Sequence, residues 1–332
     1  MPELGVALLG ATGVLGSELL ELLAEASWVD RLVPLASPAS RTPELSFRGR
    51  SLKVLNPTAD ALESVQVILS VAPRGKQTEL LRDAARAGCV VIDVANDFAD
   101  TQGVPVGGLG LQTSELDAVP EVGLVVCPGP LALSMAAVAA PLHEDFGLTG
   151  LRATALMSAS TAGLRGIEEL SGQVAALFNS QDPPRRVFSE GLAFDLVPEH
   201  GEVLGGWLRC ELEAVRHASR LLGLPAKHFA VTQIVTPTFV GLGLSVHITT
   251  ETPIDAEGAV AAFEAAPYVA LSAASDLQTR SRAGKPTVHI GRVRTDPSEQ
   301  GVHFWAATDP LRLAASNAVA VVEALLERGQ LS

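Results

Sequence analysis

The chain has 332 residues and a formal net charge of −13, and 47% of its residues are hydrophobic while 18% are charged. This length and apolar content suffice for two buried cores, and the acidic balance excludes the large basic face that binding to nucleic acid or an anionic membrane requires. The three cysteines, Cys89, Cys127 and Cys210, are too few and too scattered for a disulfide framework, and no Cys/His spacing is typical of zinc sites. The N-terminus lacks the basic segment of a signal peptide, so we expect a cytoplasmic protein.

The first predicted element is a nucleotide-binding turn between a strand and a helix. An apolar run from residue 5 breaks into Gly-Ala-Thr-Gly-Val-Leu-Gly and then into a helical pattern that ends near residue 26. Glycines there allow a tight turn, bring backbone N–H groups close to a pyrophosphate and let the helix pack against the strand, while the helix N-terminus attracts the anion. We expect a dinucleotide to be bound by Gly10, Thr12, Gly13, Val14, Leu15 and Gly16.

Short apolar runs alternate with helical patterns through the first half of the chain, which predicts a parallel sheet covered by helices. The expected strands are residues 33–36, 65–71, 90–94 and 122–127, and the expected helices are residues 14–26, 77–87 and 131–146. Residues 122–142 carry no charge and are long enough to cross a bilayer. Because the Pro128-Gly129-Pro130 turn splits them and no positive-inside pattern flanks them, we interpret them as a buried strand, a turn and a buried helix.

After about residue 147 the pattern becomes that of an α+β domain. Strands are expected at residues 152–158, 229–234, 244–250, 288–294 and 302–308, and helices near residues 167–178 and 207–222. The sequence thus predicts an α/β protein with a Rossmann-like parallel-sheet domain over residues 1–128, completed by a C-terminal helix within residues 311–330, and an α+β domain over residues 129–310.

The loop after the second strand bears on the choice between NADP and NAD. That strand ends at Leu35-Ala36-Ser37 without the acidic residue that bonds a ribose 2′-hydroxyl, and Ser40 and Arg41 follow. Ser37, Ser40 and Arg41 therefore favour a 2′-phosphate and hence NADP, although serines also occur in loops for turn reasons. Arg74, in the turn after the third strand, either fills the cleft or pairs with a phosphate.

A series of motifs runs in a fixed order along the chain. They are GATGVLG at residues 10–16, LASPAS at 35–40, VIDVANDF at 91–98, PLH at 141–143, SASTAGLRGIEEL at 158–170, TQIVTPTFVGLGLSV at 232–246, GRVR at 291–294 and LAASNAV at 313–319. Together they resemble the aspartate-semialdehyde dehydrogenase family of amino-acid biosynthesis over essentially the whole chain. The resemblance implies an NADP-binding domain, a second domain for catalysis and dimerisation, reductive dephosphorylation of aspartyl phosphate, and a homodimer or homo-oligomer. It also matches Asn317 to a position close to the nicotinamide.

The chain departs from this family at the positions that carry its chemistry. The family uses a cysteine thiolate as nucleophile, a histidine that moves protons and an arginine that clamps the substrate carboxylate. These positions match Pro130, Leu242 and Val235, none of which can perform the role. We therefore predict no catalytic residue and the loss of the family's activity, as in active-site-altered bacterial paralogues that this chain resembles.

Other polar positions of the family differ as well. Met157 matches an active-site glutamine, Ala99 a phosphate-binding arginine, and His217 and Arg220 a glutamate and a lysine that help to hold substrate and phosphate.

Nearby side chains are not expected to replace the missing groups. Cys127 lies three residues before Pro130, whereas near-attack geometry tolerates only about 3–3.5 Å, so we interpret it as a buried apolar residue. Ser134 is interpreted as an ordinary helix serine, and His143, His247 and His303 as structural or surface histidines.

Three functions remain open from the sequence. The first is a non-catalytic or repurposed paralogue. The second is an NADP-dependent oxidoreductase that acts on a different, more apolar substrate in a pocket lined by Met157, Val235 and Leu242. The third is a non-catalytic dimerisation partner of a true dehydrogenase subunit. The sequence predicts no metal site and no nucleic-acid or membrane partner.

Overall fold

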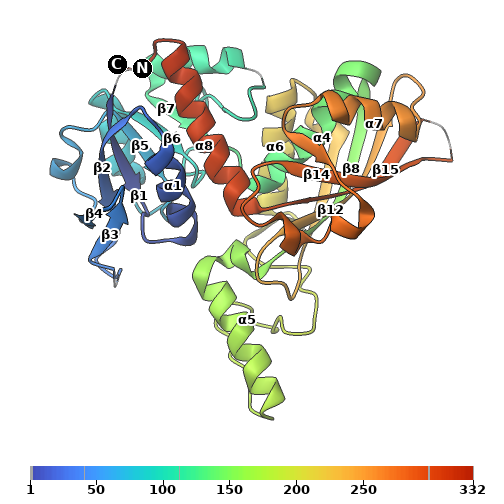
Figure 1. Cartoon of the computed structure of the whole chain (residues 1–332), viewed down its shortest axis with the longest axis horizontal. Coiled ribbons are helices and arrows are strands. Elements are labelled where there is room, and N and C mark those ends of the chain that lie inside the picture. Colours follow the sequence, from blue (N-terminus) through green and yellow to red (C-terminus); the bar gives the residue numbers. More distant parts are fainter. Residues whose placement is uncertain (1–2, 41, 112, 298–299, 332) are drawn as a thin grey trace. The chain divides into compact units, whose positions relative to one another are not determined.

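The computed structural model describes residues 3–40, 42–111, 113–297 and 300–331. The chain forms two compact units, one made of Met1–Gly129 with Ala314–Ser332 and the other of Pro130–Leu313 (Figure 1). Within the described residues, no helix combines the length and the apolar character needed to span a membrane.

The first unit is built on a parallel sheet, as the alternation of apolar runs and helical patterns predicts. Its described strands have the order β2-β1-β5-β6-β7. They are β1 (Leu4–Leu9), β2 (Val29–Leu35), β5 (Val67–Ser70), β6 (Val90–Asp93) and β7 (Leu124–Val126). The α-helices of this unit are α1 (Val14–Glu25), α2 (Thr78–Arg86), α3 (Val119–Val122) and the part of α8 (Pro310–Glu327) from Ala314 onward. Parallel neighbours require such crossover connections.

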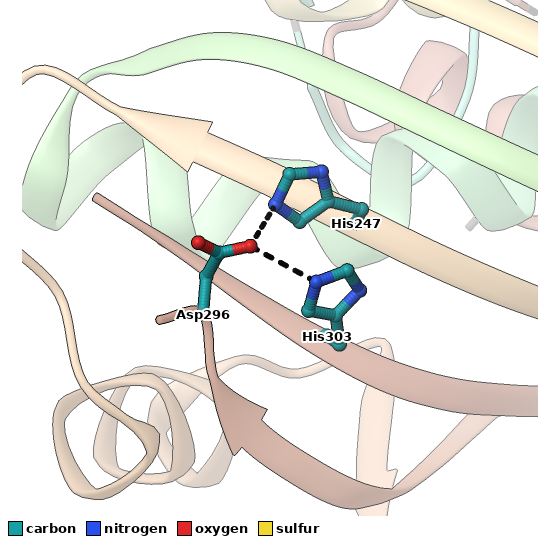
Figure 2. Close-up of side chains that lie close together, drawn as sticks. All are labelled: His247, Asp296 and His303. Carbon is teal, nitrogen blue, oxygen red and sulfur yellow. Dashed lines mark hydrogen bonds and ion pairs between the residues drawn. The ribbon is translucent and has the colours of Figure 1, made fainter. Parts of the chain in front are cut away.

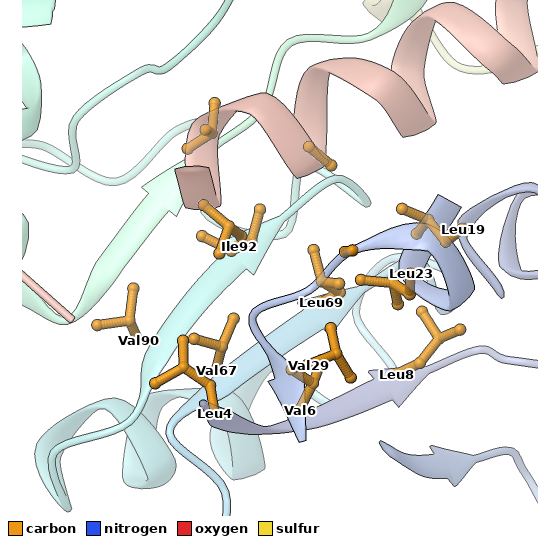
Figure 3. Close-up of a cluster of buried hydrophobic side chains, with 14 of the residues drawn as sticks. Leu4, Val6, Leu8, Leu19, Leu23, Val29, Val67, Leu69, Val90 and Ile92 are labelled. Carbon is orange, nitrogen blue, oxygen red and sulfur yellow. The ribbon is translucent and has the colours of Figure 1, made fainter. Parts of the chain in front are cut away.

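The core of this unit lies between the sheet and its helices. Figure 3 shows side chains from β1, β5 and β6, among them Val6 and Leu69, packed with Leu19 and Leu23 of α1. Ala315, Val322 and Leu325 of α8 belong to the same cluster, although some 300 residues separate them from β1. Burial of this apolar surface is the main force that holds the last helix in the first unit.

The second unit contains a mixed sheet with the strand order β11-β8-β12-β15-β14-β13 among the described residues. These strands are β8 (Leu148–Met157), β11 (Phe229–Val235), β12 (Leu242–Thr250), β13 (Val269–Leu271), β14 (Val288–Thr295) and β15 (Gly301–Thr308). The helices α4 (Pro130–Phe146), α6 (Arg209–Leu222) and α7 (Ala256–Ala265) pack on the sheet, and α5 (Gly163–Phe178) extends away from it (Figure 1). The helices bury one face of each central strand, which explains the alternating burial along β12.

Several elements carry no clear signal in the sequence. The hairpin of β3 (Glu44–Phe47) and β4 (Arg50–Lys53) is mostly exposed, so its residues show little apolar alternation. Helix α7 and strand β13 are short, and short elements give weak periodicity. The helix expected from residue 207 begins at Arg209, because Trp207–Leu208 form β10, which pairs with β9 (Val203–Leu204).

Candidate functional site

The glycine turn after β1 has the backbone geometry that its sequence predicts. Gly10 has a φ of 95°, and a Cβ atom there would lie 2.9 Å from the backbone of Val71 and Ala72. A Cβ atom on Gly16 would collide with the carbonyl oxygen of Gly10. The backbone N–H of Gly10 donates to the carbonyl of Leu35 at 2.8 Å and ties the turn to the end of β2. Only glycine satisfies both close approaches.

Gly13 places the N-terminus of α1 directly after this turn. It is the N-cap of the helix and provides no side-chain cap. The first N–H groups of a helix have no acceptor within it, so the backbone N–H groups of Val14, Leu15 and Gly16 are donors suited to an anion. The helix dipole adds a partial positive charge at the same place.

The loop after β2 lies against the glycine turn. The hydroxyl of Ser40 donates to the hydroxyl of Thr12 at 3.1 Å, and the backbone N–H of Ser40 donates to the carbonyl of Ser37 at 2.9 Å. Three of the residues selected from the sequence for nucleotide binding are therefore brought together. Arg41 lies outside the described residues.

Asn317 and Arg74 have protein partners in the first unit. The side-chain oxygen of Asn317 accepts from the backbone N–H of Leu109 at 2.9 Å, and its amide nitrogen donates to the carbonyl of Gly107 at 3.3 Å. Arg74 forms an ion pair with Asp100 at 3.1 Å. A bound phosphate would have to compete with Asp100 for this guanidinium, and Asn317 already serves to hold the loop at residues 107–109.

In the second unit, strand register brings together three residues that the resemblance matches to polar positions of the family's active site. Met157 at the end of β8 pairs with Val235 at the end of β11 and with Leu242 at the start of β12. Residues directly opposite on neighbouring strands project to the same face, so the three side chains form one apolar row. All three are buried, with exposed fractions of 6%, 1% and 0%.

Val235, which the resemblance matches to the family's arginine clamp, is part of a hydrophobic core. Val235 clusters with five other buried residues, which are Ala159, Leu170, Phe188, Leu192 and Val197. Val197 and Val235 also exchange two backbone hydrogen bonds, of 2.8 and 2.9 Å. The side chain that stands where the resemblance places a substrate clamp therefore holds the segment around α5 against β11.

The segment that would carry the nucleophile offers no substitute for it. Pro130 is the first residue of α4, and its carbonyl accepts the hydroxyl of Ser134 at 2.7 Å. Cys127 is fully buried, and burial, reinforced by the charge of Asp93, raises the pKa of its thiol well above the usual range. A thiol in such surroundings stays protonated and inert, which agrees with its interpretation as a small apolar residue.

Ala99 and His217, which the resemblance also matches to polar positions of the family, are buried, whereas Arg220 is half-buried. Ala99 is buried in the first unit, and His217 in α6 of the second unit is 1% exposed. His143 accepts the backbone N–H of Leu148 at its Nδ1 atom, 3.1 Å away, and thereby links the end of α4 to β8. This contact gives His143 the structural role expected from the sequence.

A pocket of about 580 Å³ lies between the loop that joins β11 to β12 and residues 279–283. It is lined by Thr238, Phe239, Val240, Gly241, Thr279, Arg280, Ala283 and Asp309. Asp309 accepts the backbone N–H groups of Leu311, Arg312 and Gly284, so this carboxylate is committed to the start of α8 and the adjoining turn.

Asp93 is a titratable group that sequence reasoning missed. It is fully buried at the end of β6 and accepts the backbone N–H groups of Asp97 at 3.1 Å and Phe98 at 2.8 Å. Burial raises the pKa of this carboxyl group to about 6, although the two backbone hydrogen bonds oppose the shift. The carboxyl group folds the turn after β6, within the VIDVANDF motif.

A second overlooked group consists of His247, Asp296 and His303, which meet on the sheet of the second unit (Figure 2). The spacing of these three residues along the chain does not match a metal-binding sequence motif. Only the pairing of β12 with β15 and the turn after β14 bring them together.

Two family descriptions match the chain and between them cover most of it. Residues 5–123 match "Semialdehyde dehydrogenase, NAD binding domain", and residues 139–313 match "Semialdehyde dehydrogenase, dimerisation domain". The first match contains the glycine turn, and the second contains the apolar row.

Individual relatives agree with this assignment. Aspartate-semialdehyde dehydrogenase 2 of Vibrio cholerae is 30% identical over 98% of both chains, and the USG-1 protein homolog of Azotobacter vinelandii is 29% identical over 99% of both. The crystal structure of aspartate semialdehyde dehydrogenase II from Vibrio cholerae, complexed with ASA, superposes with a TM-score of 0.92 at 29% identity, covering 98% of this chain and 99% of that one. The chain therefore belongs to the semialdehyde dehydrogenase family, with an NAD-binding domain followed by a dimerisation domain.

Proposed function

We propose that this protein is a homodimeric member of the family that binds NADP and lacks the semialdehyde dehydrogenase reaction. The observation that carries the proposal is the buried apolar row of Met157, Val235 and Leu242, together with Pro130 at the start of α4. The match of residues 139–313 to a dimerisation domain supports the homodimer.

The chemistry of the reaction explains why these replacements matter. Thioester formation needs a nucleophile, proton transfer needs a titratable base, and the substrate carboxylate needs a charged partner when it leaves water. Proline, leucine and valine supply none of these groups. Loss of a nucleophile and its base typically lowers the rate by several orders of magnitude, about 10⁶-fold where both act as a unit.

The activity can be tested directly with aspartate semialdehyde, phosphate and NADP. We expect no phosphate-dependent formation of NADPH by the full-length chain, purified from a host that lacks its own aspartate-semialdehyde dehydrogenase. An active dehydrogenase of the family, assayed in parallel, controls for substrate quality. Phosphate-dependent turnover by the purified chain would contradict the proposal, and loss of turnover after further purification would identify a contaminant instead.

The nucleotide part of the proposal rests on the first unit alone. Gly10, Gly13 and Gly16 shape the turn, and Val14 and Leu15 begin the helix that follows it. The turn contributes the hydroxyl of Thr12, the loop after β2 contributes those of Ser37 and Ser40, and β2 ends without an acidic side chain. A ribose 2′-phosphate is favoured where such an acid is missing.

Calorimetric titration with NADP and NAD tests this part. We expect NADP to bind more tightly than NAD, and Gly16→Ala to abolish binding of both because a Cβ atom at this position strikes the carbonyl of Gly10. Gly172→Ala, in α5, is a control for the effect of an added methyl group, because a Cβ atom there meets only the Cγ atom of Pro184 at 3.4 Å. If neither nucleotide binds, the turn is only a structural element and the function rests on protein partners; if NADP binds, reduction of other, more apolar substrates becomes the next assay.

A further inference from the structure

Two histidines and one aspartate meet on the face of the second sheet that its helices leave open. His247 of β12 lies directly opposite His303 of β15, and Asp296 follows β14. Their strand neighbours Val246 and Phe304 are buried on the other face, where Phe304 packs edge-on against Phe263 of α7. Because successive side chains alternate between faces, the two histidines project away from α7.

The three side chains converge through their polar atoms. The Nε2 atoms of His247 and His303 lie 3.1 and 3.0 Å from the same Oδ2 atom of Asp296. The two imidazole rings are stacked, with centroids 4.2 Å apart and planes inclined by 13° (Figure 2). All three candidate donor atoms lie within 4.8 Å of one another.

One carboxylate oxygen serves both imidazoles. His303 forms a hydrogen bond with Asp296, whereas Nε2 of His247 lies 3.1 Å from the same oxygen in an ion pair whose geometry is too poor for a well-aligned hydrogen bond. A buried imidazole nitrogen is most favourable with a well-aligned polar partner. A cation placed between the three atoms would supply it.

The backbone around the cluster holds the donors in place. The N–H of Asp296 donates to the carbonyl of Gly301 at 2.8 Å and closes the turn between β14 and β15. A Cβ atom on Gly301 would lie 2.5 Å from the carbonyl oxygen of Ile248 and 3.1 Å from Nε2 of His247, so the close pairing of β12 with β15 beside the cluster requires glycine there. The aspartate is therefore positioned by the backbone and not only by the two histidines.

We propose that His247, Asp296 and His303 bind one Zn²⁺ ion, with a fourth coordination position open to water. Two imidazole nitrogens and one carboxylate oxygen are a typical donor set for zinc, whereas Mg²⁺ and Ca²⁺ prefer oxygen ligands alone. Bonds of about 2.0–2.2 Å allow donor atoms 3.0–3.1 Å apart to bind one ion. Because the lone pairs of stacked rings run parallel, the two imidazoles must rotate out of the stack to direct both Nε2 atoms at the ion.

Neighbouring charged residues affect the affinity of this site for a cation. Arg152 lies opposite His247 on β8, and Arg294 lies opposite His303 on β14. Arg152 donates to the carbonyls of Leu151 and His228 at 2.9 Å, and Arg294 donates to the carbonyl of Arg292 at 2.8 Å. Two nearby positive charges oppose a cation, so we expect weaker binding than in a fully enclosed structural zinc site.

Titration of the full-length chain with Zn²⁺ tests the proposal. The protein is prepared without a histidine tag, stripped of metal and titrated calorimetrically with zinc alone. We expect one bound ion per chain, and Asp296→Asn and His303→Gln should each weaken binding by at least about tenfold, the loss seen even for outer partners of metal ligands. His200→Gln, outside the cluster, and Cys210→Ser, which removes the least buried thiol, should bind zinc like the parent chain.

A second measurement separates metal binding from folding. Co²⁺ replaces zinc in such donor sets, and its visible absorption reports the coordinating atoms, so Asp296→Asn should lose the cobalt spectrum while keeping the circular dichroism of the parent chain. Absence of saturable zinc binding, unchanged affinity in Asp296→Asn and His303→Gln, or loss of binding in Cys210→Ser would each overturn the proposal.

Discussion

Single buried residues decide what this protein can do chemically. Cys127 retains a thiol but is fully buried with a raised pKa, while Asp93 retains an ionisable carboxyl group that only folds a turn. Both could be located in the sequence, but their ionisation could not, because the pKa of a group depends on desolvation and on contacts made by distant segments.

Asp93 should impose a pH dependence on stability. Its pKa is raised by burial to about 6, above the ordinary 3.8, so the folded state binds the proton more tightly than the unfolded state does. The stabilisation is fully present below about pH 4 and is lost as the pH rises through 6, by an amount of roughly 2–3 kcal/mol. Asn resembles the protonated acid, so Asp93→Asn should remove this part of the pH dependence.

Urea unfolding from pH 4 to pH 7 measures the effect as the difference between variant and parent. Asp60→Asn, at an exposed position of the same unit, serves as the control and should leave the pH profile unchanged. Identical pH profiles for Asp93→Asn and the parent would show that the carboxyl group titrates normally in the folded protein.

At the scale of elements, apolar and polar periodicity predicted the main strands and helices of both units. The sequence could not supply the register of β8, β11 and β12, because strand pairing is set by contacts between segments far apart in the chain. For the same reason His247 and His303 were interpreted as separate residues and Asp296 was not singled out. Only the resemblance drew attention to Met157, Val235 and Leu242, and their burial became known from the structure.

The apolar row should resist the restoration of a charged clamp. Val235→Arg places a guanidinium in the core formed with Phe188 and Leu192, and we expect it to lower the free energy of unfolding by about 3 kcal/mol or more. Thr232→Arg, on an exposed position of the same strand, should change it by no more than about 0.5 kcal/mol.

Chemical unfolding of the two variants beside the parent chain provides the comparison. If Val235→Arg were as stable as the parent, the row would border an open cleft. Its apolar side chains would then be available to a substrate. This result would favour a repurposed oxidoreductase over a non-catalytic protein.

For the whole molecule, the two units raise separate functional questions. The first unit has the glycine geometry expected of a nucleotide site, and the second contains the buried apolar row of Met157, Val235 and Leu242. The expected result is therefore binding of NADP without dehydrogenase turnover. Because the two assays address different units, failure of one does not decide the other.

The last helix has a consequence for how the chain is made. Val322 and Leu325 of α8 belong to the same hydrophobic core as Leu4 of β1, so this core cannot be completed until the last residues of the chain have left the ribosome. The second unit, encoded between these two parts, is fully synthesised earlier and can fold first. During synthesis, the apolar side chains of the N-terminal strands therefore stay exposed until α8 is made. Ribosome-associated chaperones can bind this segment for longer than any later one.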